Sequence, residues 1–246
     1  MRWDGTTWAQ LGSGLDFRVN ALAVFDDGTG PALYAGGVFI GGGSEPNKVV
    51  RWDGTTWAQL GSGIMNGDVN ALAVFDDGTG PALYVGGTFS KVGDAAAWRI
   101  ARWDGTAWAP LGMGVGSWEN TVRSLAVFDD GTGPALYVGG GEPNIAGGQA
   151  DFIARWDGTT WEQLASGLEG TVRALVVFDD GTGPALYAGG HFSFAGSPFA
   201  NSVVRWDGTS WSQLGQLVGS FNGTGIALSA FDDGTGPALY AGGPFA

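Results

Sequence analysis

The sequence predicts an all-β fold, a closed five-bladed β-propeller of four-stranded antiparallel blades. The string FDDGTGPALY occurs five times without a change. A second string, RWDGT followed by one residue and Trp, also occurs five times. Its copies begin at Arg2, Arg51, Arg102, Arg155 and Arg205. A period of about 50 residues with strand-rich runs inside it is typical of a propeller or a repeat array.

The first repeat predicts four short strands. They cover residues 19–25, 32–39, 48–52 and 57–60. The first two are joined by the turn DDGTGP, and the last two by DGT, which is a strong hairpin signal between strand-like runs. A loop that varies between repeats, residues 40–47, separates the two hairpins. Each repeat is therefore expected to form one four-stranded sheet.

The termini predict that the ring closes. The strands are apolar at almost every position, which suits sheets covered on both faces by neighbouring blades. Residues 2–11 supply only the last two strands of a blade and residues 226–245 only the first two, so joining them would remove two exposed sheet edges. We expect one domain over residues 1–246, with blades at 19–60, 69–111, 122–164, 172–214, and 226–245 with 2–11.

Composition excludes several partners and chemistries. The formal net charge of −13 disfavours nucleic acid and anionic membranes. No apolar run is long enough for membrane insertion, and the absence of cysteine removes disulfides and thiolate metal sites. The sequence begins within a repeat and shows no signal peptide, so we expect an excised, permuted or engineered piece. The compartment stays open, with an extracellular or cell-surface parent protein as the expectation.

The recurring Trp and Gly residues are interpreted as packing residues. Ten of the 12 Trp lie in the RWDGTxW strings, where burying each indole removes about 150–250 Å² from water. A platform for sugar stacking is the alternative. The glycine pairs after the second strand, such as Gly36 and Gly37, allow another backbone or a ring to approach closely.

The acids of the turns gather at one end of each predicted blade. Asp26, Asp27 and Asp53 represent three positions that recur in every repeat. Calcium binding is one interpretation, because calcium takes several oxygen ligands. The favoured interpretation is that these carboxylates accept backbone hydrogen bonds in their own turns, since DDGTG lacks the acid spacing of known calcium loops. Arg51 and its equivalents are expected to pair partially with these acids on a solvated rim.

The opposite end of each blade carries the segments that differ between repeats, and it is the predicted ligand-binding face. Aromatic side chains on loops over a rigid scaffold are typical of binding surfaces, although such rings also cover blade tops. His191 is the only histidine, so no His cluster exists for metal or triad chemistry, and we expect it on the surface. The candidate ligand-binding residues are Phe17, Trp98, Trp118, Phe152, His191, Phe194, Phe199 and Phe221.

The same end carries acids that leave a hydrolase open as a minor alternative. A pair of carboxylates flanking a sugar bond is the basis of glycoside hydrolysis. A charged rim is the simpler interpretation. The acids are Asp16, Asp68, Glu119 and Glu169, with Arg18, Arg123 and Arg173 nearby in the sequence.

A strand ending in Tyr-x-Gly-Gly, then a variable loop, an apolar strand, a turn and a Trp, resembles the kelch repeat of bacterial type over all five periods. The resemblance implies a β-propeller that binds other proteins. The five-blade count and the Leu-Tyr of the second strand are also similar to tachylectin-type lectins, whose blades each bind an amino sugar. Neither resemblance assigns a site residue, and fold alone does not determine function.

The sequence thus predicts a non-catalytic binding or adhesion module, a monomer whose variable-loop face binds a glycan or a protein segment. We expect no catalytic residue, no metal and no cofactor. A structural or engineered scaffold propeller without a small ligand is the alternative, which the near-identity of the repeats favours.

Overall fold

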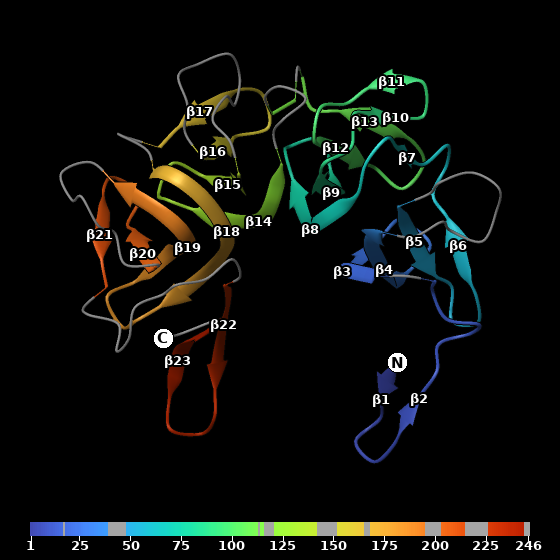
Figure 1. Ribbon diagram of the computed structural model, residues 1–246, viewed down its shortest axis with the longest axis horizontal. Helices are drawn as coiled ribbons and strands as arrows, with labels where there is room; N and C mark the ends of the chain where they lie inside the picture. Colours follow the sequence, from blue (N-terminus) through green and yellow to red (C-terminus); the bar gives the residue numbers. More distant parts are fainter. Residues whose placement is uncertain are drawn as a thin grey trace. The chain divides into compact units, whose positions relative to one another are not determined.

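The computed structural model describes residues 1–16, 18–38, 48–112, 114–115, 121–141, 152–164, 168–194, 203–214 and 226–243 (Figure 1). Their contacts form two compact units, one of Met1–Asp76 with Gly80–Gly114 and one of Asp77–Thr79 with Val115–Ala246. The single-domain expectation stays a prediction. No helix among the described residues is long and apolar enough to cross a bilayer.

The first unit contains two four-stranded antiparallel sheets. One runs in the order β3 (Arg18–Asp26), β4 (Pro31–Val38), β5 (Val49–Trp52) and β6 (Trp57–Gln59). The other runs in the order β8 (Val69–Asp76), β9 (Pro81–Gly87), β12 (Ile100–Trp103) and β13 (Trp108–Pro110). Both follow chain order, as a meander of two consecutive hairpins requires.

The second unit also contains two such sheets. One is β14 (Val122–Asp129), β15 (Pro134–Gly140), β16 (Ile153–Trp156) and β17 (Trp161–Gln163). The other is β18 (Leu168–Asp179), β19 (Pro184–Phe194), β20 (Val203–Trp206) and β21 (Trp211–Gln213). The predicted all-β class and the four-stranded antiparallel sheet of each of these repeats are confirmed.

Turn chemistry explains where the strands begin and end. In the second unit the hairpin pairs Phe128 with Ala135 and Asp129 with Pro134, which leaves the Asp-Gly-Thr-Gly turn between them. Proline begins the second strand, a position where its missing N–H breaks no interior ladder bond. A register shift between Val122 and Ser124 marks a β-bulge near the start of the first strand.

The core lies between neighbouring sheets and is built from the repeated aromatic and branched residues. Tyr34, Tyr84 and Tyr137 are fully buried, and Phe128 is 4% exposed. Each tyrosine packs on the phenylalanine of its own hairpin, with ring centroids 5.8 Å apart for Phe128 and Tyr137. In the four-stranded sheets, Trp103, Trp156 and Trp206 are buried as the packing prediction expects, and Trp52 is partly buried.

The first glycine of each pair is where the next sheet approaches. A Cβ on Gly36 would lie 3.3 Å from the Cβ of Val69, and one on Gly139 would lie 3.2 Å from the Cβ of Val172. The neighbour is therefore a valine side chain, where the sequence suggested a backbone or a ring. The second glycine of the pair instead meets backbone, since Gly140 lies against the carbonyl of Thr121.

A two-stranded sheet lies near each end of the chain. β1 (Arg2–Trp3) pairs with β2 (Trp8–Ala9), and β22 (Ala227–Asp232) pairs with β23 (Pro237–Gly242). Each is an antiparallel hairpin with the register of its counterparts. The aromatic rings with the highest exposed fractions among the described residues lie on these hairpins, at Trp3, Trp8, Phe231 and Tyr240.

A small sheet that the sequence did not predict lies in the first unit. It has the order β7 (Ile64–Met65), β10 (Lys91–Val92) and β11 (Ala95–Ala96). It joins the segment before β8 to the loop that follows β9, so two variable segments support one another. Val92, Ile64 and Phe89 are buried in the core of this unit.

Candidate functional site

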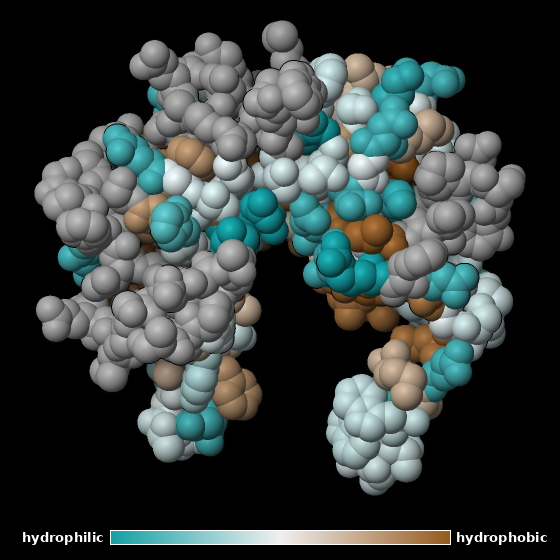
Figure 2. Space-filling view, in the orientation of Figure 1, coloured by the Kyte–Doolittle hydropathy of each residue, from teal (hydrophilic) through white to brown (hydrophobic). Residues whose placement is uncertain are grey.

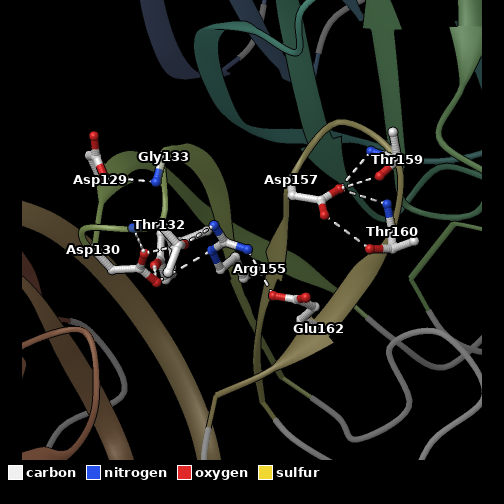
Figure 3. Close-up of polar contacts among 10 residues, drawn as sticks. Asp129, Asp130, Thr132, Gly133, Arg155, Asp157, Thr159, Thr160 and Glu162 are labelled. Carbon is white, nitrogen blue, oxygen red and sulfur yellow. Dashed lines mark hydrogen bonds and ion pairs between the residues drawn. The ribbon is translucent and has the colours of Figure 1, made fainter.

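Each four-stranded sheet has a turn end, where its two hairpin turns lie, and a loop end opposite. At the turn end of β14–β17, the first acid of DDGTG holds the turn together (Figure 3). Asp129 Oδ1 accepts hydrogen bonds from the backbone N–H groups of Gly131 at 2.9 Å and Gly133 at 3.1 Å. This is the turn role expected of an aspartate in front of glycine.

The second acid connects the turn to the sheet. Asp130 Oδ1 accepts bonds from the N–H of Thr132 at 3.1 Å and from its hydroxyl at 2.6 Å. Asp130 Oδ2 accepts the hydroxyl of Tyr137 at 2.8 Å and lies 3.4 Å from Nε of Arg155. Burial opposes ionisation of Asp130, but the bonds from Thr132 and Tyr137 and the charge of Arg155 outweigh it and lower its pKa.

The arginine of RWDGT bridges the two hairpins of the sheet (Figure 3). Arg155 donates to the hydroxyl of Thr132 at 2.6 Å and to Glu162 Oε2 at 2.7 Å. The side chains of Arg155 and Asp130 are only 10% and 8% exposed. The expectation of pairing on a solvated rim is therefore wrong for this pair. The turn of the next sheet lies against it, since a Cβ on Gly208 would lie 2.7 Å from the carbonyl oxygen of Asp130.

The second turn uses its acid in the same local manner. Asp157 Oδ1 accepts bonds from the N–H groups of Thr159 and Thr160, each at 2.7 Å, and Oδ2 accepts the Thr160 hydroxyl at 3.0 Å (Figure 3). These backbone bonds lower the pKa of Asp157. Asp207, in the equivalent turn of β20 and β21, has its pKa lowered to about 2 by the N–H groups of Thr209 and Ser210.

The carboxylates of the turn end thus accept hydrogen bonds from their own hairpins. The same contacts recur around Asp27, Asp180 and Asp233, where the tyrosine hydroxyl lies 2.9, 3.0 and 3.2 Å from the carboxylate. Since the acids accept from N–H and O–H donors of their own hairpins, few lone pairs point outward for a cation. Among the described residues, no group of three or more His, Cys, Asp or Glu side chains could hold a metal ion.

A hollow of about 320 Å³ lies at the turn end of the β3–β6 sheet. Its lining comes from the two turns of this sheet, from the start of β4 and from the end of β5. The lining residues are Thr29, Gly30, Pro31, Ala32, Leu33, Arg51, Trp52, Asp53 and Gly54. The residues that line the hollow belong to the two strings that recur in every repeat. The hollow therefore lies at the end of the sheet that does not vary between repeats.

Trp98 is the predicted binding residue that the structure presents most clearly. It lies at the loop end of the β8–β13 sheet, in the segment between β11 and β12, and it is 39% exposed. The residues on both sides of it, Ala97 and Arg99, are buried. Ala97 N–H donates to the carbonyl of Ser90 at 2.9 Å, and Arg99 N–H donates to that of Phe89 at 3.0 Å.

Arg99 fixes the segment around Trp98, and the sequence did not identify it as a candidate residue. Its guanidinium donates to the carbonyls of Thr88 and of Phe89, the latter at 3.0 Å, and burial lowers its pKa. Its φ of +68° places a non-glycine residue in the left-handed region. The only sequence signal was its position, since no other repeat has an arginine directly before the third strand.

The other candidate residues divide into four groups. Phe152 is partly buried and packs against the core of the second unit, so it covers the sheet as the alternative interpretation held. His191 is exposed on β19, opposite Thr171, which agrees with the expected surface position. Phe194 is the last residue of β19, and its side chain lies outside the described part of the structure. The remaining rings, Phe17, Trp118, Phe199 and Phe221, lie outside the described residues.

The described acids of the loop end have different surroundings. Asp68 lies 3.9 Å from Lys48 Nζ, and its backbone N–H donates to the hydroxyl of Thr88 at 2.8 Å. Asp16 and Glu169 are exposed, and Glu119 lies outside the described residues. Partial burial and then the charge of Arg173 lower the pKa of Arg123.

No protein-family model matches this chain, and neither a curated protein nor a solved structure shows significant similarity to it. The kelch-like resemblance therefore depends on the repeat residues alone.

Proposed function

We propose that this chain is a non-catalytic binding module, a closed five-bladed propeller of kelch-like repeats whose loop end binds a glycan or an exposed protein segment. The single observation that supports it most is the contrast at Trp98. A large ring that the repeat does not require is 39% exposed, although the backbone on both sides of it is fixed by hydrogen bonds. A fixed, exposed indole offers a flat apolar face at small cost in ordering on binding.

Two further observations support the choice of the loop end. The turn end uses its carboxylates and hydroxyls within its own hairpins, as around Asp130 and Asp157, so it offers few groups to a ligand. The loop end instead combines Trp98 with the exposed charges Lys91 and Asp94 of the same loop. Polar groups beside an aromatic platform are what recognition of a sugar or a peptide requires.

The ring is proposed from the two-stranded sheets at the chain ends. In complete sheets the second strand pairs with the third, as Leu136 does with Trp156. β23 carries the second-strand sequence and β1 the third-strand sequence, so the same register would pair Leu239 with Trp3. That pairing would complete a fifth blade from residues 226–245 and 2–11.

A glycan microarray with the fluorescently labelled full chain tests the binding function, followed by the variants Trp98→Ala and Thr106→Ala. Thr106 lies at the turn end of the same sheet, where its hydroxyl donates to Asp104 at 2.8 Å, so it serves as the matched control. We expect Trp98→Ala to weaken binding of the best glycan about tenfold or more, and Thr106→Ala to leave it unchanged.

Three outcomes decide between the functions. Binding that survives Trp98→Ala would contradict the aromatic platform. A chain that binds neither glycans nor a displayed peptide library would favour the scaffold propeller, which the near-identity of the repeats also favours. Turnover of a polysaccharide that is lost on changing Glu169 would favour the hydrolase over a binding module.

A further inference from the structure

We propose that Arg123 and Arg173, in the second unit, form an anion-binding site for a phosphate group, either free or carried by a sugar. The inference goes beyond the proposed function, because it assigns a ligand chemistry to residues that have no part in the aromatic platform at Trp98. It uses only contacts within the second unit, compared with the equivalent contacts within the first.

A β-bulge presents one extra residue from the first strand of each four-stranded sheet. In β3 the pairing with β4 shifts between Val19 and Ala21, so Asn20 is the extra residue. A bulge re-aims its side chain relative to the regular strand and is frequent beside functional sites. The first unit has asparagine at this position and the second unit has arginine. The extra residues of the other three sheets are Asn70 in β8, Arg123 in β14 and Arg173 in β18.

The two bulged asparagines of the first unit meet one another. Asn20 Nδ2 donates to the backbone carbonyl of Val69 at 2.8 Å and to Oδ1 of Asn70 at 3.4 Å. Such a pair can form because an amide side chain both donates and accepts hydrogen bonds. The position is filled there without any charge, so the repeat does not need arginine at its bulge in order to fold.

The second unit brings its two bulged arginines to the same positions. Gly139 receives Val172 of β18, as its counterpart receives a valine in the first unit, so neighbouring sheets pack alike in both units. The backbone N–H of Leu175 donates to Ser124 Oγ at 2.9 Å, which ties the residue after Arg123 to β18. Figure 2 shows hydrophilic residues, in teal, over the adjoining parts of β14 and β18.

Two guanidinium groups cannot satisfy one another as two amides do, because both are positive and both only donate. Arg51, Arg155 and Arg205 each pair with an aspartate of the turn end. Among the described residues of the second unit, no carboxylate lies within ion-pair distance of Arg123 or Arg173. Burial, and after it the charge of Arg173, lowers the pKa of Arg123, as expected for neighbouring like charges.

Further donors lie at the same end of these sheets. The Nε and Nη2 atoms of Arg123 lie 3.2 and 3.5 Å from the position of a Cβ on Gly141, so the guanidinium lies beside bare backbone. The residue at that position in the next sheet is His191, which is exposed opposite Thr171. Nε of Arg173 is buried and has no hydrogen-bond partner among the described residues.

A doubly charged tetrahedral group matches this set of donors. Phosphate carries a charge of about −1.5 to −2 at neutral pH, both as the free ion and as an ester. The planar fork of a guanidinium donates two parallel hydrogen bonds to phosphate oxygens. An anion between Arg123 and Arg173 would replace their repulsion with charge-assisted hydrogen bonds. Because the chain has a formal net charge of −13, its general field repels anions, and only such a local site would bind one.

Isothermal titration calorimetry of the full chain with inorganic phosphate tests the site, at low ionic strength to limit screening. We expect a dissociation constant of about 1 mM or lower. Acetate, which has a single charge, should bind about tenfold more weakly or worse. A parallel titration with glucose 6-phosphate distinguishes the two sources. Tighter binding than inorganic phosphate would assign a phosphorylated sugar, and weaker binding would assign the free ion.

Arg173→Asn gives the fourth repeat the residue that the second repeat has at the same bulge, so the substitution is compatible with the strand. We expect Arg173→Asn and Arg123→Asn each to weaken phosphate binding about tenfold or more. Arg18→Asn is the control, because it removes the same charge from an exposed residue of the first unit and should change the affinity by less than about twofold. Circular dichroism confirms that each variant is folded.

Absence of phosphate binding by the unchanged protein would overturn the proposal. Unchanged affinity in both folded asparagine variants, or an equal loss in Arg18→Asn, would overturn it as well, since the attraction would then be general. Acetate that binds as tightly as phosphate would contradict a doubly charged ligand. None of these measurements depends on Trp98 or on closure of the ring, so this proposal and the proposed function can fail separately.

Discussion

Two copies of the same ten residues differ in how far their side chains are buried. Tyr137, in a four-stranded sheet, is fully buried, whereas Tyr240, in the two-stranded sheet β22–β23, is 43% exposed. The phenylalanines that pack on them are 4% exposed at Phe128 and 60% exposed at Phe231. Their turns are nevertheless alike, since Thr132 and Thr235 both donate their hydroxyls at 2.6 Å to the preceding aspartate.

The difference separates local from tertiary structure. The turn, the strand pairing and the Tyr–Asp hydrogen bond come from the decapeptide itself and are present in both copies. Burial of the rings and the arginine bridge require the third strand and a neighbouring sheet. Most of the stability of a repeat should therefore come from what covers the hairpin.

Removing the arginine bridge of a complete sheet should destabilise the protein strongly. Arg155→Ala should destabilise the protein by about 3 kcal/mol, because it leaves Asp130 buried without its cation. Urea unfolding of the full chain measures it. Glu162→Gln is the matched control, and since Glu162 is 53% exposed, its loss should cost less than about 1 kcal/mol. Equal effects of the two variants would show that the bridge acts as a surface pair.

Acid should weaken the turns of complete and two-stranded sheets alike. Hydrogen bonds lower the pKa of Asp157, Asp207 and Asp233 below the ordinary value of 3.8, so the unfolded chain binds more protons than the folded chain in acid. Their contribution is then complete above about pH 4 and is lost as the pH falls toward the folded pKa, which is about 2 for Asp207.

The urea midpoint measured between pH 5 and pH 2 should therefore fall steadily below pH 4. A midpoint that stays constant over this range would contradict the turn hydrogen bonds of these carboxylates.

The sequence predicted the repeated part of the fold well. The expected strands at 19–25 and 32–39 correspond to β3 and β4, because Asp-Gly turns and the apolar runs beside them are local signals. The β7–β10–β11 sheet was missed, because its strands have two residues each and form only through pairing between two variable segments.

The candidate site was predicted in part. Exposure of Trp98 agrees with its position in a loop, but Phe152, which lies one position closer to the third strand of its own repeat, packs on the core instead. Arg99 has no local signature, since its role depends on the carbonyls of Thr88 and Phe89 that the fold brings to it. Burial of the Arg155–Asp130 pair was also missed, because the neighbouring sheet that covers it cannot be read from one repeat.

The most direct test of the account compares one substitution in two copies of the decapeptide, Phe128→Ala and Phe231→Ala, by urea unfolding of the full chain. If a sheet covers β22–β23 as the proposed ring requires, both variants should lose about 3–5 kcal/mol, the usual cost of removing a buried phenylalanine. A loss of about 3–5 kcal/mol for Phe128→Ala together with less than about 1 kcal/mol for Phe231→Ala would show that the fifth hairpin remains uncovered, and would contradict the closed ring.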